Sequence, residues 1–157
     1  MLGEIIYENK GKLTGYRVLN VEDGVPKIET TISGNGKFKG GVEATDIVTY
    51  WSMPRAGGGG GVGNGVYYYA EGQGVIMTKD SSTETATWSA QGIGHYYSGQ
   101  KRRDVGSVFF RTSSSLTDKL DFLNNLVGVF EYMKLMMKAI LAEEYGNGNR
   151  RTISSIP

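Results

Sequence analysis

The sequence predicts a single all-β domain: an antiparallel meander barrel of about eight strands, followed by a C-terminal amphipathic helix. Two observations lead to this prediction. Short stretches rich in β-forming residues alternate with Gly-rich turns, and Gly accounts for 24 of the 157 residues. In addition, no stretch before Tyr132 shows the 3.6-residue apolar period of an amphipathic helix.

The predicted strands follow one another without intervening helices. They cover residues 12–21, 26–32, 42–53, 66–79, 83–97, 104–112 and 127–132, whereas residues 119–126 fit neither a strand nor a helix clearly. The first strand ends at an Asp23-Gly24 turn signal, and the second ends at Gly34-Asn35-Gly36. This order favours a meander, because consecutive strands with short turns pair as antiparallel neighbours.

One hairpin carries a local symmetry of glycines. Folding the chain about Ser82 places Gln73 opposite Gln91 and Gly72 opposite Gly92. Side chains alternate along a strand, so Tyr69, Glu71 and Gln73 share one face, and Ala70, Gly72 and Gly74 share the other. Glycines repeated on paired strands are typical of the points where a sheet coils into a small closed barrel.

The C-terminal residues follow a different pattern. The apolar residues Met133, Met136, Met137, Ile140 and Leu141 recur at helical spacing. The sequence therefore predicts a barrel domain over residues 1–132, an amphipathic helix over 133–145 and a loose tail over 146–157. The apolar stripe of this helix is a candidate surface through which copies of the chain associate into a homo-oligomer.

Four segments of the chain resemble a little-characterised prokaryotic family of small barrels similar to allene oxide cyclases, the calycin-like type. They are GVEATDIVTYWSMPR (41–55), AEGQGVIMTKD (70–80), ETATWSAQGIG (84–94) and FLNNLVGVFEY (122–132). The resemblance spans roughly residues 1–132 and includes no catalytic motif. It implies a barrel whose interior accommodates a small apolar ligand.

The last 25 residues depart from that family's pattern, which ends on a further strand with a Trp-rich segment. Codons for residues Met133 to Arg150 can be chosen so that a shifted reading frame encodes an acidic turn and such a strand. One hypothesis is therefore a frameshift near Tyr132, and the other is a helix particular to this lineage. The nucleotide sequence of the gene distinguishes the two.

Composition excludes several classes of function. The net charge of +1 gives no electrostatic basis for binding nucleic acid or an anionic membrane. The absence of Cys and the single histidine, His95, exclude thiolate metal sites, multi-His metal sites and His-based triads. The pattern Gly58-x-Gly60-x-x-Gly63 precedes a strand rather than a helix, so no dinucleotide cofactor is expected. The absence of Cys and of a recognisable signal peptide favours a cytoplasmic location.

The remaining candidates belong to a ligand-binding cavity. We expect its lining to include Tyr50, Trp51, Tyr69, Gln73, Trp88, Gln91 and Phe110. Ordinary core packing explains the same aromatic residues and is the favoured explanation. Glu43, Asp46 and Glu71 lie within predicted strands, and Glu71 or Glu43 is the proton-transfer candidate should the cavity be catalytic. The favoured expectation for Glu71 is a position outside the barrel or a pairing with Arg111.

The sequence thus favours binding of a small hydrophobic molecule inside the barrel, without catalysis. Two alternatives stay open. The first is an isomerase or cyclase that works mainly through the shape of its cavity, and the second is a structural or oligomerisation module.

Overall fold

The computed structural model describes residues 4–55, 67–80, 83–97, 101–112, 119–133 and 136–141. The elements are β1 (Ile5–Glu22), β2 (Val25–Phe38), β3 (Glu43–Pro54), β4 (Tyr67–Thr78), β5 (Thr85–Tyr97), β6 (Lys101–Thr112), the short 3₁₀ helix η1 (Asp121–Asn125), β7 (Val127–Met133) and β8 (Met136–Leu141). The predicted tail over 146–157 lies outside these residues.

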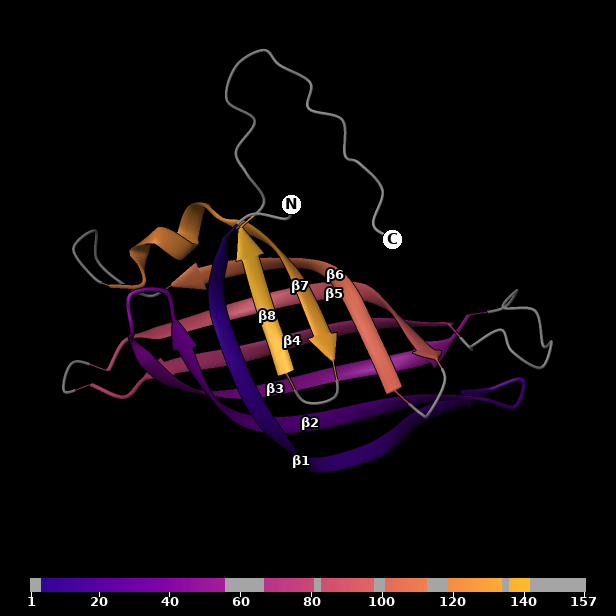
Figure 1. The fold of residues 1–157 in the computed structure, drawn as a ribbon. Coiled ribbons are helices and arrows are strands. Elements are labelled where there is room, and N and C mark those ends of the chain that lie inside the picture. Colours follow the sequence, from indigo (N-terminus) through magenta and orange to yellow (C-terminus); the bar gives the residue numbers. More distant parts are fainter. Residues whose placement is uncertain are drawn as a thin grey trace, which may run out of the picture.

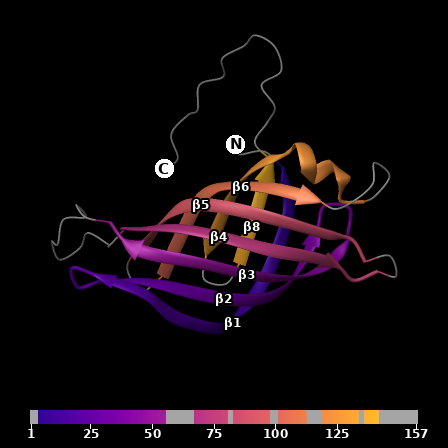
Figure 2. The ribbon, with the colours of Figure 1, turned by 180° about the vertical axis from the view of Figure 1, so that it is seen from behind.

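Strands β1 to β7 form one antiparallel meander, in which each strand pairs with the next along the chain (Figures 1 and 2). The all-β meander predicted from the sequence is therefore confirmed. The turn between β1 and β2 has positive φ at both central residues, 50° at Asp23 and 77° at Gly24. These angles fit the right-handed twist of a two-residue hairpin, which explains the Asp-Gly signal.

The two edges of this seven-strand sheet are β1 and β7, and they meet through the backbone of β8. Strand β8 pairs with β7 over Gly128–Tyr132 and with β1 over Ile5–Lys10. Figure 1 shows β8 lying between them. Strand β8 has only six residues, so both of these pairings are short.

The helix predicted over residues 133–145 is wrong, because Met136–Leu141 is an extended strand. The helical spacing of its apolar residues was the only signal in the sequence. This local spacing carries no information about β1 and β7, which each offer an unpaired row of backbone N–H and C=O groups to this segment. The side chains of Met133, Met136, Met137, Ile140 and Leu141 lie outside the described part of the structure, so their role in an oligomer stays a prediction.

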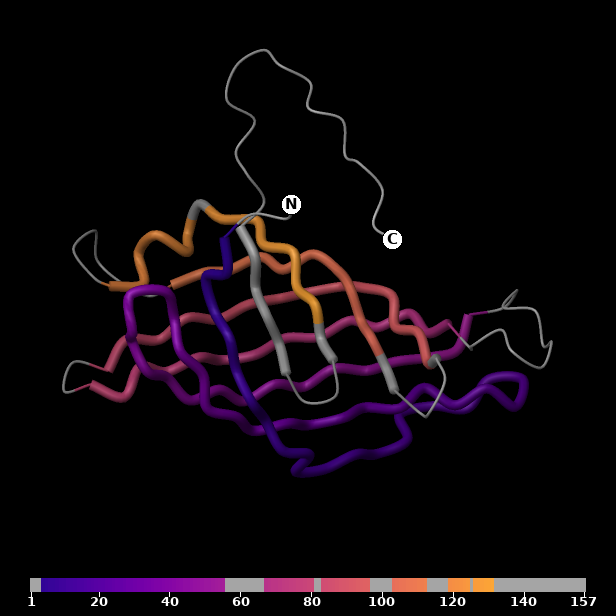
Figure 3. The backbone as a smooth tube through the Cα atoms, in the orientation of Figure 1, coloured from indigo at the N-terminus to yellow at the C-terminus, as the bar shows by residue number. Residues whose placement is uncertain are grey.

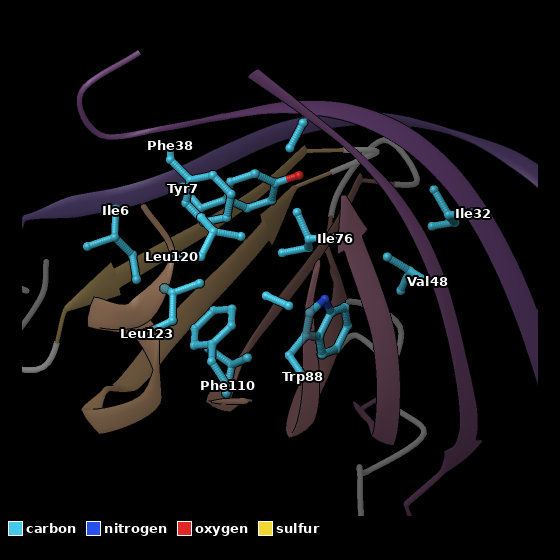
Figure 4. Packing of buried hydrophobic residues seen from close by; sticks show 13 residues of the cluster. Ile6, Tyr7, Ile32, Phe38, Val48, Ile76, Trp88, Phe110, Leu120 and Leu123 are labelled. Carbon is cyan, nitrogen blue, oxygen red and sulfur yellow. The ribbon is translucent and has the colours of Figure 1, made fainter. Parts of the chain in front are cut away.

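The hydrophobic core fills one end of the sheet's inner face (Figure 4). Its buried members are Ile6, Tyr7, Ile32, Phe38, Ala44, Val48, Ile76, Ala86, Trp88, Val108, Phe110, Leu120 and Leu123. The last two come from η1 and the turn before it, in the stretch whose structure the sequence left open. The Glu84 carboxylate accepts the backbone N–H groups of Lys119 and Leu120, at 3.2 and 3.0 Å, and so anchors this segment to the start of β5.

The register of the β4–β5 hairpin differs from the prediction by two residues. Gln73 lies opposite Ser89, and Gly72 lies opposite Ala90. The turn is centred one residue earlier because the Thr78 hydroxyl accepts the Glu84 N–H, at 2.8 Å, and donates to Asp80, at 3.0 Å. A shift of two residues preserves the alternation of faces, so the predicted grouping of side chains by face is correct.

Strand β2 also extends beyond its predicted end. It continues through Gly34-Asn35-Gly36 to Phe38. The two glycines face inward, where the Tyr7 ring lies against Gly36 and the Asp46 carboxylate lies against Gly34. They are positions of close approach inside a strand rather than a turn.

Candidate functional site

A void lies on the inner face of the sheet, beside the core. It is a cavity of about 70 Å³, lined by Tyr50, Ala70, Glu71, Gly72, Trp88, Ala90, Gln91, Gly92, Asp104 and Phe130. Two rows of paired residues explain why it exists. One row runs Tyr50, Gly72, Ala90 across β3 to β5, and the other runs Ala70, Gly92, Gly106, Phe130 across β4 to β7. Because Gly and Ala carry little or no side chain, these rows leave space that Leu or Val would fill.

Aromatic residues lie directly against the glycines that border this void. A methyl group added at Gly72 would come 2.9 Å from Cβ of Tyr50, and one added at Gly92 would come 2.9 Å from Cζ of Phe130. Glycine at these positions lets the aromatic side chains pack on bare backbone. Aromatic side chains and main chain therefore make up much of the cavity wall, which suits an apolar or planar molecule.

The indole of Trp88 supplies a polar group in this wall. Its ring packs over Gly74, where an added Cβ would lie 2.6 Å from Nε1. Figure 4 shows the Trp88 indole among the buried core residues. The residue is 6% exposed, and its Nε1 has no hydrogen-bond acceptor among the described residues. A buried N–H without an acceptor is costly and uncommon in folded proteins. An acceptor on a bound molecule would remove that cost.

The inner apolar surface continues from the cavity onto β1. The first row extends from Tyr50 through Thr30 to Tyr16, and the second extends from Ala70 through β3 and β2 to Val18. Tyr16 is 75% exposed and Val18 is 59% exposed. The wall opposite these residues is short, since β7 and β8 have only seven and six residues. The inner face is thus filled at one end and open at the other.

The predicted ligand-binding residues divide between the two faces of the sheet. Tyr50, Trp88 and Phe110 are on the inner face, as expected for a cavity lining. Trp51, Tyr69, Gln73 and Gln91 alternate with inward-facing neighbours and lie on the outer face. Gln91 also borders the cavity, between Ala90 and Gly92. The sequence could not separate them, because alternation shows which residues share a face but not which face is inside.

The outer group forms a polar surface of its own. The Tyr69 hydroxyl donates to Oε1 of Glu71 at 2.6 Å and is 3.2 Å from Oε1 of Gln91, while the Tyr69 ring is 5.6 Å from that of Trp51. The hydrogen bond to Glu71 raises the pKa of the Tyr69 hydroxyl. Trp51, Gln73 and Gln91 border an open groove of about 450 Å³. These contacts involve exposed side chains, and water competes for them.

Both carboxylates considered for proton transfer are on the outside. Glu71 and Glu43 are exposed. Glu71 borders the cavity between Ala70 and Gly72, but its carboxylate accepts the hydrogen bond from the Tyr69 hydroxyl on the outer face. The buried carboxylates are instead Asp46, 1% exposed, and Asp104, 7% exposed. Of these two, only Asp104 borders the cavity.

Asp46 belongs to a buried polar cluster that sequence reasoning missed. Its Oδ2 accepts hydrogen bonds from the Tyr7 hydroxyl, at 2.8 Å, and from Nδ2 of Asn9. Both partners come from β1, whereas Asp46 lies near the start of β3. A signal was available, since Asp46 stands between Ala44 and Val48 on an otherwise apolar face of its strand. The cluster joins two strands that are not neighbours in the sheet, because β2 lies between them.

This cluster predicts a loss of stability at alkaline pH. Burial, together with the charge and hydrogen bond of Asp46, raises the pKa of the Tyr7 hydroxyl well above its usual value of 10.0. Above about pH 10 the unfolded chain releases this proton, whereas the folded chain retains it. The free energy of unfolding should therefore fall as the pH rises from 10 to 12. In Tyr7→Phe this fall should be shallower, as measured by urea denaturation at each pH; equal slopes would contradict the assignment.

The described residues show no other recognised type of site. Among them, no group of three or more His, Cys, Asp and Glu side chains is placed to hold a metal ion. No helix in the same part of the chain has the length and apolar character needed to cross a membrane. The His95 ring stacks on that of Tyr67, with ring centroids 4.5 Å apart.

Comparison with known proteins identifies no family. No family model, no curated protein and no solved structure matches the chain. What is established is therefore the seven-strand antiparallel meander and the geometry of its inner face.

Proposed function

We propose that the meander, closed by β8, works as a small barrel that binds a largely apolar molecule on its inner face without transforming it. This is also the arrangement implied by the resemblance to allene-oxide-cyclase-like barrels, which remains part of the proposal. The observation that carries it is the void beneath the Gly and Ala rows, with the unpaired Trp88 N–H in its wall.

The proposed ligand has an apolar body and one hydrogen-bond acceptor. The acceptor would pair with Nε1 of Trp88. The buried carboxylate of Asp104 in the same wall disfavours a carboxylate on the ligand, because like charges in a poorly solvated site repel strongly. A neutral carbonyl, such as that of a ketone, aldehyde or ester, suits this site better than a fatty acid does.

The ligand must also extend beyond the cavity. A volume of about 70 Å³ is well below the several hundred Å³ of an ordinary ligand site. We expect the remainder of the molecule to lie along the open inner face toward Tyr16 and Val18, whose exposed apolar surface it would cover. Covering that surface is a source of binding energy.

A panel of terpenoid ketones, apolar esters, fatty acids and porphyrin-like compounds tests the proposal. At saturation, a neutral carbonyl compound should raise the melting temperature by several degrees. Ala90→Leu, which fills the cavity, should abolish that shift. Ser107→Leu adds a side chain of the same size on the outer face and should leave it unchanged. The proposal fails if no compound stabilises the protein, or if both variants respond alike.

A second candidate function is that of an isomerase or cyclase whose active site is the same cavity. The observation that favours it is Asp104, a buried carboxylate in the cavity wall, which replaces Glu71 and Glu43 as the proton-transfer candidate. A compound recovered chemically unchanged after prolonged incubation with the protein would exclude it for that compound. Conversion that is lost in Asp104→Asn would favour it.

A further inference from the structure

Strand β1 has a free edge over half of its length. On one side it pairs with β2 from Tyr7 to Glu22, but on the other side β8 reaches only from Ile5 to Lys10. Within the described ranges, no strand pairs with this second side of residues Lys12–Glu22, which we call the edge segment (Figure 3). A free edge of this length offers backbone N–H and C=O groups to another strand.

The edge segment also carries a row of exposed apolar side chains. Leu13, Tyr16, Val18 and Val21 are 53%, 75%, 59% and 57% exposed. Their partners in β2 are alternate residues of that strand, so all four share the inner face of the sheet. Native proteins usually protect long edges of this kind, because edges with apolar side chains associate.

The sequence of the edge segment is complementary to itself. We propose that two copies of this chain associate by antiparallel pairing of their edge segments about a two-fold axis at Arg17. In this register Leu13 lies opposite Val21 of the second copy, and Tyr16 lies opposite its Val18. On the other face Lys12 lies opposite Glu22 of the second copy, so each dimer contains two pairs of opposite charge.

Two irregularities of β1 fit this symmetry. Its register with β2 shifts between Leu13 and Gly15 and between Val18 and Asn20. At each shift β1 has one residue, Thr14 or Leu19, that has no opposite residue in β2. When these two are skipped, the residues on either side of Arg17 match in number and in face. Arg17 meets its own copy, but each guanidinium is 2.7 Å from a carboxylate oxygen of Glu29, which offsets their repulsion. In this register a second copy pairs the apolar side chains on the inner face and the opposite charges on the outer face at the same time.

Sedimentation over a roughly hundredfold range of concentration tests the association. The wild-type chain should form a dimer that dissociates on dilution. Val18→Asp should weaken the dimer at least about a hundredfold, because two charges would face apolar groups at its centre. Val127→Asp alters a valine that is 47% exposed on β7, away from the edge segment, and should leave the dimer unchanged. A wild-type chain that stays monomeric throughout the range would overturn the proposal.

A charge exchange tests the register. Lys12→Glu alone, or Glu22→Lys alone, replaces two attractive contacts with two repulsive ones and should weaken the dimer about tenfold. The double variant restores opposite charges and should recover the wild-type dissociation constant to within about threefold. Circular dichroism and the melting temperature confirm that each variant is folded. A dimer that neither single variant weakens would use another surface and would contradict the proposal.

Discussion

Replacing Asp46 with Ala is expected to lower the free energy of unfolding by about 3 kcal/mol. The substitution removes the acceptor shared by the Tyr7 hydroxyl and the Asn9 amide, both of which are buried. These two buried donors would then lose this acceptor, at a cost of about 1–3 kcal/mol each, partly offset because a buried charge is also removed. Urea denaturation at pH 7 measures the difference.

Glu43→Ala is the matched control for this result. Glu43 lies on the same strand as Asp46, but it is exposed on the outer face. We expect its substitution to change the free energy of unfolding by no more than about 0.5 kcal/mol. A loss below about 1 kcal/mol in Asp46→Ala would show that the cluster does not hold β1 against β3.

Replacing Gly106 with Ala is expected to lower the free energy of unfolding by about 3 kcal/mol. The added methyl group would lie 2.7 Å from Cα of Gly92 on the neighbouring strand and 2.6 Å from Cε1 of Phe130. The first contact is with backbone, so it can be relieved only by moving β5 away from β6. This strain would fall on the row of residues that borders the cavity.

Gly15→Ala provides the comparison for Gly106→Ala. A methyl group added at Gly15 meets nothing within 4 Å. Gly15→Ala should change the free energy of unfolding by no more than about 0.5 kcal/mol. The change is slightly stabilising if the lower conformational entropy of the unfolded variant chain dominates. Similar losses in the two variants, measured by urea denaturation, would mean that the close approach at Gly106 does not limit the packing of β5 on β6.

Local patterns in the sequence were sufficient to predict the meander. The Asp23-Gly24 turn and the alternation of Tyr69, Glu71 and Gln73 depend on residues close together in the chain, and the structure has both. The paired glycines were interpreted as points where the sheet coils into a closed barrel, and that interpretation stays a prediction. In the structure, a side chain added at Gly72 would meet Cβ of Tyr50, and one added at Gly92 would meet the Val105 carbonyl oxygen and the Phe130 ring.

Features that depend on distant residues could not be predicted in the same way. Whether residues 136–141 form a helix or a strand depends on the free edges of β1 and β7, which the local apolar spacing does not report. The division of Trp51 and Trp88 between the outer and inner faces depends on which face the rest of the chain covers. For the same reason, the burial of Asp46 became evident only when its partners Tyr7 and Asn9 were placed beside it.

The proposal of an inner binding site is tested most directly by the fluorescence of Trp88. The chain has two tryptophans, so Trp51→Phe leaves Trp88, in the cavity wall, as the only one. Titration of this variant with a brominated apolar ketone should quench the Trp88 emission in a saturable way, and the same titration in the Trp51→Phe/Ala90→Leu variant should not. Quenching that rises linearly without saturation, or that persists when Ala90 is replaced, would contradict binding on the inner face.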